Sequence, residues 1–153
     1  MAKKVKVGDL TQVLTSQGVA YAHYTHKHDE YGYFIRVFTG FYAEVPMDYD
    51  KVCNSNVLFS AFFPLQSAVN QGLVSVVGNM DVAPSLSTFP VFRARNGGAG
   101  GSIWLWDGAN SVRLDRLLTH VEQCFPVKSI ISAPLLVDRI QRGYRAEVDD
   151  RWT

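Results

Sequence analysis

The sequence predicts an α+β fold, in which a curved antiparallel sheet of the SH3-like kind precedes mixed strands and two to three short helices. Three observations support this prediction. Strand-like runs fill roughly the first forty residues, helical signals come only later, and 47% of the residues are hydrophobic, which is enough for a core. The 153 residues also suit one domain, covering positions 1–153, with no internal repeat.

The N-terminal part has the pattern of an antiparallel meander. Short β-branched and aromatic runs (LTQVLT, VAYAHYTH and YGYFIRVFTGFY) are separated by glycine, aspartate and polar turns. Side chains alternate between the two faces of a strand, so the second run divides into two sets. We expect Tyr21, His23 and Thr25 on one face, and Ala22, Tyr24 and His26 on the other.

A short helix and two further strands follow in the middle of the chain. Residues 64–71 begin with a proline suited to a first helical turn and end before Gly72, which is suited to a helix stop. Residues 73–77 (LVSVV) are typical of a strand. Residues 102–106 (SIWLW) are apolar at every position after the serine, which favours a central strand buried on both faces.

Two more helices are expected towards the C-terminus. Residues 114–125 carry apolar side chains at helical spacing, with Asp115 as a cap and a proline just beyond the end. Residues 134–142 lie between a proline and a glycine and contain an aspartate and an arginine one turn apart.

The charge balance excludes some classes of partner. Fifteen basic residues face fourteen acidic ones, giving a net charge of +1, whereas nucleic-acid and anionic-membrane binders need a dense positive surface. The N-terminal lysines are followed by no apolar stretch of the kind found in secretory signals, and the longest uncharged run is too polar to span a membrane. Cys53 and Cys124 lack metal-binding spacing, so we expect two free thiols in a reducing cytoplasm.

A long segment of the chain is almost free of charge. Between residues 52 and 92 the sole charged side chain is Asp81. Such a segment belongs either to the core or to a surface that a partner covers, because protein interfaces have few charges at their centre. The second alternative leaves room for a homodimer.

The segment HYTHKHDEYG, residues 23–32, concentrates three of the four histidines. A metal site is one interpretation, with His23, His26, His28 and Asp29 as ligands. The other is the polar turn of a hairpin, since chain reversals are polar and exposed. No second ligand motif stands elsewhere in the chain, so the turn is the favoured interpretation, with neither a metal nor a cofactor.

Other candidate motifs are weak. The glycine-rich stretch RARNGGAGG, residues 93–101, is followed by a strand pattern instead of a helix, so it predicts a connector and not a phosphate-binding loop. The acidic residues between 44 and 50 are expected in a solvated loop. No nucleophile motif such as GxSxG or HExxH occurs, so the residues themselves do not indicate an enzyme.

Taken in order, a set of patterns resembles the immunity protein 26 family over residues 5–143. These patterns are VKVGDL, GVAYAHYT, YGYFIRVFTGFY, FFPLQSAVNQGLVSVVG, FPVFR, WLWDG, VRL and APLLVDRI. Six residues match aromatic, proline and arginine positions of the family pattern: Phe38, Phe41, Pro64, Phe92, Arg93 and Trp106.

The resemblance implies a cytoplasmic α+β protein that binds and neutralises a cognate bacterial polymorphic toxin in a stoichiometric complex, without nucleic acid or membrane. The hairpin then supplies the partner-binding residues Tyr24, His26, His28, Asp29, Glu30, Tyr31 and Tyr33. The family label is shared with a small phosphotriesterase-like hydrolase, so a metal-dependent enzyme using the histidine cluster is the alternative. A structural or interaction protein that reuses the fold is the third possibility.

Overall fold

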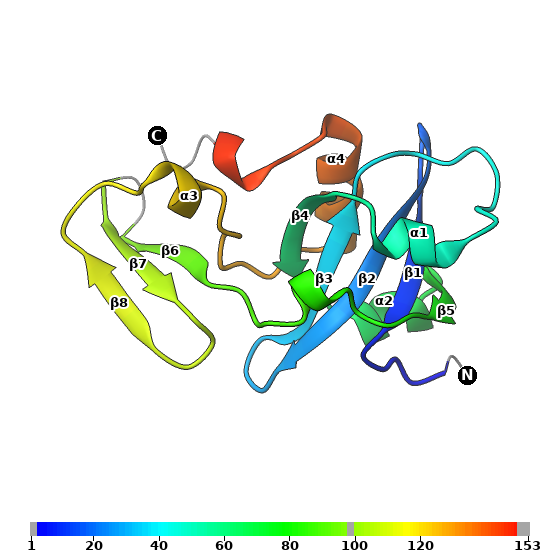
Figure 1. Ribbon diagram of the computed structural model, residues 1–153, viewed down its shortest axis with the longest axis horizontal. Coiled ribbons are helices and arrows are strands. Elements are labelled where there is room, and N and C mark those ends of the chain that lie inside the picture. Colours follow the sequence, from blue (N-terminus) through cyan, green and yellow to red (C-terminus); the bar gives the residue numbers. More distant parts are fainter. Residues whose placement is uncertain (1–2, 98–99, 150–153) are drawn as a thin grey trace.

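The computed structural model describes residues 3–97 and 100–149 and contains two antiparallel sheets (Figure 1). The larger sheet has the order β4-β3-β2-β1-β5, and the smaller has the order β6-β7-β8. The strands are β1 (Asp9–Thr15), β2 (Gly18–His28), β3 (Gly32–Phe38), β4 (Val57–Phe62), β5 (Ser75–Asn79), β6 (Phe92–Asn96), β7 (Ser102–Trp106) and β8 (Ser111–Leu114). The helices are α1 (Tyr49–Cys53), α2 (Leu65–Asn70), α3 (His120–Gln123) and α4 (Ala133–Arg142), with 3-10 turns η1 (Pro84–Leu86) and η2 (Ala146–Val148).

This architecture confirms the α+β prediction. The meander β1-β2-β3, the strand β5, the central place of β7 and the helices α2 and α4 all lie where the sequence indicates them. The strand β7 is only half-buried before Trp106, however, so its expected burial on both faces is wrong. The SH3-like curvature remains a prediction. Both cysteines are free thiols, as expected, and no helix among the described residues has the length and apolarity needed to cross a membrane.

The larger sheet is buried on both faces. One face packs against α2 and α4, with side chains such as Ala22 and Ile35 against Leu136 and Ile140. The opposite face is covered along part of its length by α1 and its neighbours, where Tyr21 packs with Phe38 and Val52. The remaining part of that face contacts the smaller sheet through four buried aromatic rings. These rings belong to Phe34, Phe62, Phe92 and Trp106.

The helix predicted for residues 114–125 is much shorter in the structure. Leu114 remains paired in β8, and α3 begins only after Thr119, whose hydroxyl accepts from the Glu122 backbone N–H. The Glu122 carboxylate accepts from the Thr119 N–H in return and pairs with Arg116, which lowers the pKa of the Glu122 carboxyl to about 2. Leu117 is 85% exposed, so the apolar spacing in this segment does not mark a buried helical face.

An extended segment, residues 126–131, joins the two sheets. It bridges β4 in the parallel direction: the Phe62 N–H donates to the Ser129 carbonyl (3.3 Å), and the Ile131 N–H donates to the Phe62 carbonyl (3.0 Å). The segment therefore covers this end of the β4 edge, which would otherwise expose unpaired backbone groups.

The same segment binds the smaller sheet through Arg93 on β6. The Arg93 N–H donates to the Pro126 carbonyl (3.0 Å), and the Arg93 carbonyl accepts from the Lys128 N–H (2.9 Å). The guanidinium of Arg93 is buried and donates to the carbonyls of Phe125 and Ala146. Main chain and side chain of this arginine thus fix the segment and the C-terminal turn η2 to one strand.

We predict that Gly108→Ala destabilises the junction between the sheets. Gly108 has φ +102° in the β7–β8 turn, and a Cβ at this position would lie 2.7 Å from Cε1 of Phe89. The backbone strain costs about 1–3 kcal/mol, and the contact adds to it because Phe89 is packed within the aromatic cluster. The loss is measured as a fall in the free energy of unfolding in urea.

Gly40→Ala is the matched control. Gly40 has nearly the same backbone angle (φ +98°), but a Cβ added there would meet no atom within 4 Å. The Gly40→Ala variant should therefore lose only the part of the free energy of unfolding that comes from backbone strain. Equal destabilisation by the two substitutions would contradict a tight contact between the β7–β8 turn and Phe89.

Candidate protein-binding surface

A β-bulge at Thr25 decides which histidines share a face of β2. Tyr24 pairs with Ile35 and His26 pairs with Phe34, so Thr25 is the extra residue. The bulge turns His26 onto the face that carries His23. The expected placement of these two histidines on opposite faces is therefore wrong, because simple alternation holds only in a regular strand.

His23 lies in the interior of the protein, with 0% of its surface exposed. Its Nε2 donates to the carbonyls of Gly8 (2.9 Å) and Met80 (3.0 Å), which joins the start of β1 to the end of the β5 segment. Its Nδ1 is buried and has no hydrogen-bond partner among the described residues. Burial lowers the pKa of this imidazole, so the neutral form is favoured.

His26 belongs to a chain of hydrogen bonds that crosses the same face. Nε of Arg36 donates to the Thr25 hydroxyl (3.4 Å), this hydroxyl contacts Nδ1 of His26 (2.9 Å), and Nε2 of His26 donates to the Ser87 carbonyl (2.9 Å). Arg36 also donates to the Leu86 carbonyl (3.3 Å), so two side chains hold the end of η1 against the sheet. Burial lowers the pKa of Arg36 to about 10 and also lowers that of His26.

His28 connects two loops. Its Nδ1 accepts from the backbone N–H groups of Glu30 (3.1 Å) and Tyr31 (3.3 Å), so its proton lies on Nε2, which donates to the Gly108 carbonyl (2.7 Å). The ring also packs 4.9 Å from that of Trp106. His28 therefore fixes both the conformation of the β2–β3 turn and its position beside the β7–β8 turn.

The tip of the β2–β3 hairpin is the exposed part of the histidine segment, residues 23–32. Asp29 and Glu30 are exposed, and Tyr31 and Tyr33 are half-buried. Tyr24, by contrast, is 3% exposed and packs in the core against the ring of Tyr33 (5.3 Å between centroids). Its expected place in an exposed partner-binding surface is wrong, because its face of β2 is the one covered by α2 and α4.

Two lysines complete the aromatic part of this surface. The ammonium group of Lys27 lies 5.5 Å from the centroid of the Tyr33 ring. The ammonium group of Lys128 lies 4.6 Å from the ring of Tyr31 and 4.3 Å from that of Trp106. Such cation–π contacts attract by about 0.5–1 kcal/mol at exposed sites and favour these relative positions of ring and ammonium group. We call this set of residues the tip surface: Lys27, Asp29, Glu30, Tyr31, Tyr33 and Lys128.

The histidines are not arranged as a metal site. Within residues 3–97 and 100–149, no three His, Cys, Asp or Glu side chains are close enough to hold a metal ion. The ligand set considered above, His23, His26, His28 and Asp29, is therefore not assembled. The ring nitrogens of His26 and His28 are already engaged in protein hydrogen bonds, and His23 is enclosed.

The other sequence motifs have structural positions. Residues 93–96 of the glycine-rich stretch belong to β6, whereas Gly98 and Ala99 lie outside the described residues. Of the six residues on which the sequence resemblance rested, Phe38, Phe92, Arg93 and Trp106 are buried, and Phe41 and Pro64 are exposed.

Comparisons with known proteins give no match. No family model, no curated protein and no solved structure is significantly similar to this chain.

Three residues of this region were not indicated by the sequence. Phe89 and Lys128 meet the hairpin from positions that are distant in the chain, and Arg36 lies on its second strand, β3; no local pattern marks any of them. Lys27 lies within the histidine segment, residues 23–32, and could have been included among the predicted partner-binding residues. It pairs with Tyr33 across the hairpin, and side chains directly opposite one another on paired strands are within reach.

We predict that acid weakens the fold below about pH 6.5. In the unfolded chain a histidine titrates near 6.5, whereas burial lowers the pKa of His23 and His26 in the folded protein. Between the folded and unfolded values the unfolded state binds more protons, so stability falls as pH decreases. Thermal unfolding followed from about pH 7.5 to about pH 5.5 measures this loss, before the carboxylates titrate.

His26→Gln separates the two contributions. Glutamine retains an N–H donor for the Ser87 carbonyl but cannot titrate. This variant should therefore lose the part of the pH dependence that His26 contributes and keep the part that His23 contributes. A melting temperature that does not change between these two pH values in the parent protein would disprove the prediction.

Proposed function

We propose that this chain is an immunity-type protein, which binds and neutralises a cognate bacterial toxin through a stoichiometric complex in the cytoplasm. The observation that carries the proposal is the tip surface, whose turn is held by hydrogen bonds. It places two exposed carboxylates, Asp29 and Glu30, beside Tyr31, on a turn that His28 holds through three hydrogen bonds.

The composition of the tip surface suits protein recognition. Tyrosine is enriched among residues that contribute most to binding energy, since it adds contact area and a polar group at a small cost in conformational entropy. A turn already fixed in the free protein loses little further entropy on binding. Interfaces of stable complexes bury roughly 1,600 Å² in total, so the partner also has to contact neighbouring elements such as the β7–β8 turn.

The same geometry disfavours the metal-dependent hydrolase. Hydrolysis of this kind needs ligands that converge on one ion and an open position for substrate. In the described part of the chain these ligands do not converge, and the imidazoles of His26 and His28 bind backbone groups instead. We therefore retain binding as the proposed activity, with a toxin as the partner and neither nucleic acid nor membrane involved.

We predict that the tip surface is required for neutralisation. Asp29→Ala, Glu30→Ala and Tyr31→Ala together remove both exposed carboxylates and the ring next to Lys128, so toxin binding should weaken at least about tenfold. The test co-expresses the tagged protein with the product of the neighbouring upstream gene. Co-elution in size-exclusion chromatography and relief of toxicity are scored for the parent and for the variant.

The control removes the same charge from a region beyond the other end of β3. Glu44→Ala and Asp50→Ala change exposed residues of the loop after β3 and of α1, which lie away from the hairpin tip (Figure 1). This variant should neutralise like the parent. A tip variant that folds and still neutralises the toxin fully would show that the partner binds elsewhere. A parent protein that neither binds the product of the neighbouring gene nor relieves its toxicity would refute the immunity function.

A further inference from the structure

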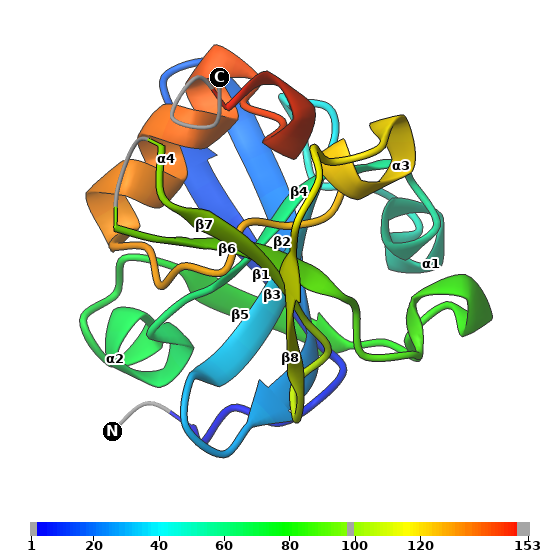
Figure 2. The ribbon, with the colours of Figure 1, turned by 90° about the vertical axis from the view of Figure 1, so that its left-hand side faces the viewer.

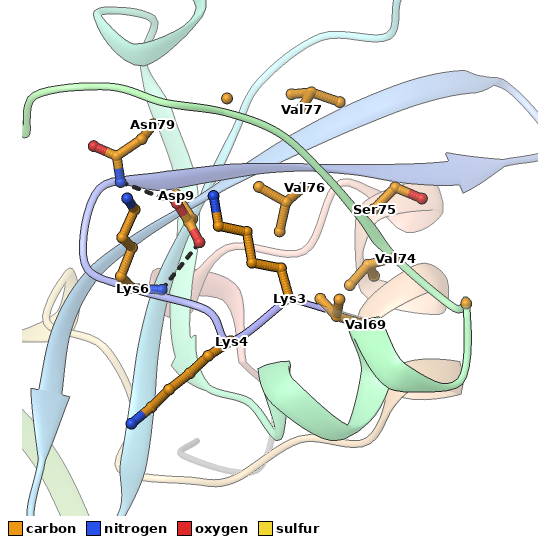
Figure 3. A pocket seen from close by; sticks show the side chains of 12 residues that line it. Lys3, Lys4, Lys6, Asp9, Val69, Val74, Ser75, Val76, Val77 and Asn79 are labelled. Atoms are coloured by element: carbon orange, nitrogen blue, oxygen red, sulfur yellow. Dashed lines mark hydrogen bonds between the residues drawn. The ribbon is translucent and has the colours of Figure 1, made fainter. Parts of the chain in front are cut away.

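A groove of about 530 Å³ runs along β5, at the other edge of the larger sheet from β4. Its walls are β5 and the residues just before it on one side, and Lys3, Lys4 and Lys6 on the other (Figure 3). The N-terminal segment is held in place from α2, since the Gln66 side chain accepts from the Val5 N–H (2.8 Å).

The groove has an excess of positive charge. Among the described residues that line it, Asp9 is the one acidic residue, and its carboxylate already accepts from the Lys6 backbone N–H (3.0 Å) and from Nδ2 of Asn79 (2.9 Å). The ion pairs found in the described part of the chain, Arg116–Glu122 and Arg142–Asp138, use none of the three lysines. Figure 3 shows the Lys3 side chain reaching towards Asp9, whereas the side chain of Lys4, which also lines the groove, points in the opposite direction, away from Asp9 and β5.

β5 is an edge strand without the usual protection. It pairs with β1 on one side, and its sequence SVVGN contains no charged residue and no proline. Natural edge strands normally carry such residues, because an open edge pairs readily with another extended chain. Val76 is 40% exposed on this strand. β5 is thus a part of the nearly uncharged segment, residues 52–92, that lies on a surface and not in the core.

Figure 1 shows β5 at the right-hand margin of the larger sheet, and in Figure 2, viewed from the opposite end, β5 lies behind the front strands with α2 to its left. The opposite margin, at β4, is bridged by residues 126–131, whereas β5 has β1 as its strand neighbour. The two edges of the larger sheet therefore differ. Among the described residues the β5 edge has no second strand neighbour, so a further strand can pair with it.

We propose that the β5 groove binds an extended acidic segment of a partner protein. The segment adds to the edge as a further strand, so that backbone groups of β5 pair with it and its carboxylates lie near Lys3 and Lys6. Addition of a strand explains the unprotected edge, and the lysines give the site its preference for acidic sequences. The identification of that partner as the toxin rests on the proposed function, but the groove itself does not.

A second copy of this chain fits the groove poorly. Edge-to-edge pairing of two β5 strands about a two-fold axis would bring both sets of lysines to one interface, where like charges repel. The acidic hairpin tip of another copy has no free edge to offer either, because β2 is flanked by β1 and β3, and β3 by β2 and β4.

The test uses a short fluorescein-labelled peptide that alternates glutamate and valine, titrated with the full chain and followed by fluorescence polarisation. We expect saturable binding at about 0.05 M salt that weakens strongly at about 0.5 M. Lys3→Ala combined with Lys6→Ala should weaken binding about three- to tenfold or more. Lys4→Ala is the matched control and should change it less than about twofold, because that side chain points away.

A second pair of variants tests the strand. Val76→Glu places a like charge on the edge and should abolish binding of the peptide, whereas Val76→Thr keeps a β-branched side chain and should preserve it. Hydrogen exchange should show that amides of β5 become protected when the peptide is bound. Equal effects of the Lys4 variant and the Lys3/Lys6 variant, or protection elsewhere without protection of β5, would overturn the proposal.

The outcomes separate this inference from the proposed function. If the protein binds the peptide but neutralises no toxin, the groove is supported and the immunity role is refuted. A chain that neutralises a toxin but does not bind the peptide, or that forms a dimer through β5 instead, would refute the groove alone.

Discussion

The structure depends on one extended segment, residues 126–131, which is bonded to β4 on one side and to β6 on the other. Without these parallel bridges the two sheets would be joined mainly by contacts among aromatic rings, which are favourable but tolerate several relative orientations. Backbone hydrogen bonds are directional, so they fix one orientation. This in turn places the β7–β8 turn beside the hairpin tip, where the Gly108 carbonyl meets His28. The same bridge covers part of the β4 edge and leaves β5 as the open edge of the larger sheet.

The histidine segment resembles a catalytic cluster in sequence and serves as a set of connectors in the structure. Each of the three imidazoles donates to a backbone carbonyl in a distant loop, namely those of Met80, Ser87 and Gly108. Loops that cross the face of a sheet have carbonyl groups that no ladder satisfies, and leaving such groups buried without a donor costs about 1–3 kcal/mol each. A neutral imidazole is suited to binding such carbonyl groups, because it offers one N–H donor on a flat ring that packs among aromatic side chains. Concentration of histidines in one segment is therefore explained without a metal or a reaction.

Local signals in the sequence were sufficient wherever a single element decides its own structure. The proline before α2, Gly143 after α4 and the β-branched and aromatic runs of β1 and β3 act over a few residues, and these elements were predicted. The errors occur where distant residues decide. The bulge at Thr25 depends on how β2 pairs with β3. The apolar spacing that begins at Leu114 predicted a helix, but Leu114 is paired in β8. The helix α1 was missed because Asp48, which caps it, stands in an acidic stretch that is also typical of a solvated loop. The site was only partly predictable for the same reason: the hairpin tip is local, whereas Lys128 reaches it from a distant part of the chain.

The net charge of +1 conceals two surfaces of different charge composition. The tip surface presents the carboxylates of Asp29 and Glu30 together with the ammonium groups of Lys27 and Lys128, whereas the β5 groove presents Lys3 and Lys6 beside an uncharged edge. Under the two proposals, a partner that binds both surfaces offers aromatic groups and charges of both signs to the tip and an acidic extended chain to the β5 edge. A partner that has only one of these features is expected to bind more weakly. Charges at the rim of an interface affect the rate of association and the choice of partner more than the final affinity, because they are screened by salt and remain solvated. Under the two proposals, a tip of mixed charge and a separate basic groove together give selectivity between related partners, without the strong field that would attract nucleic acid or anionic membranes.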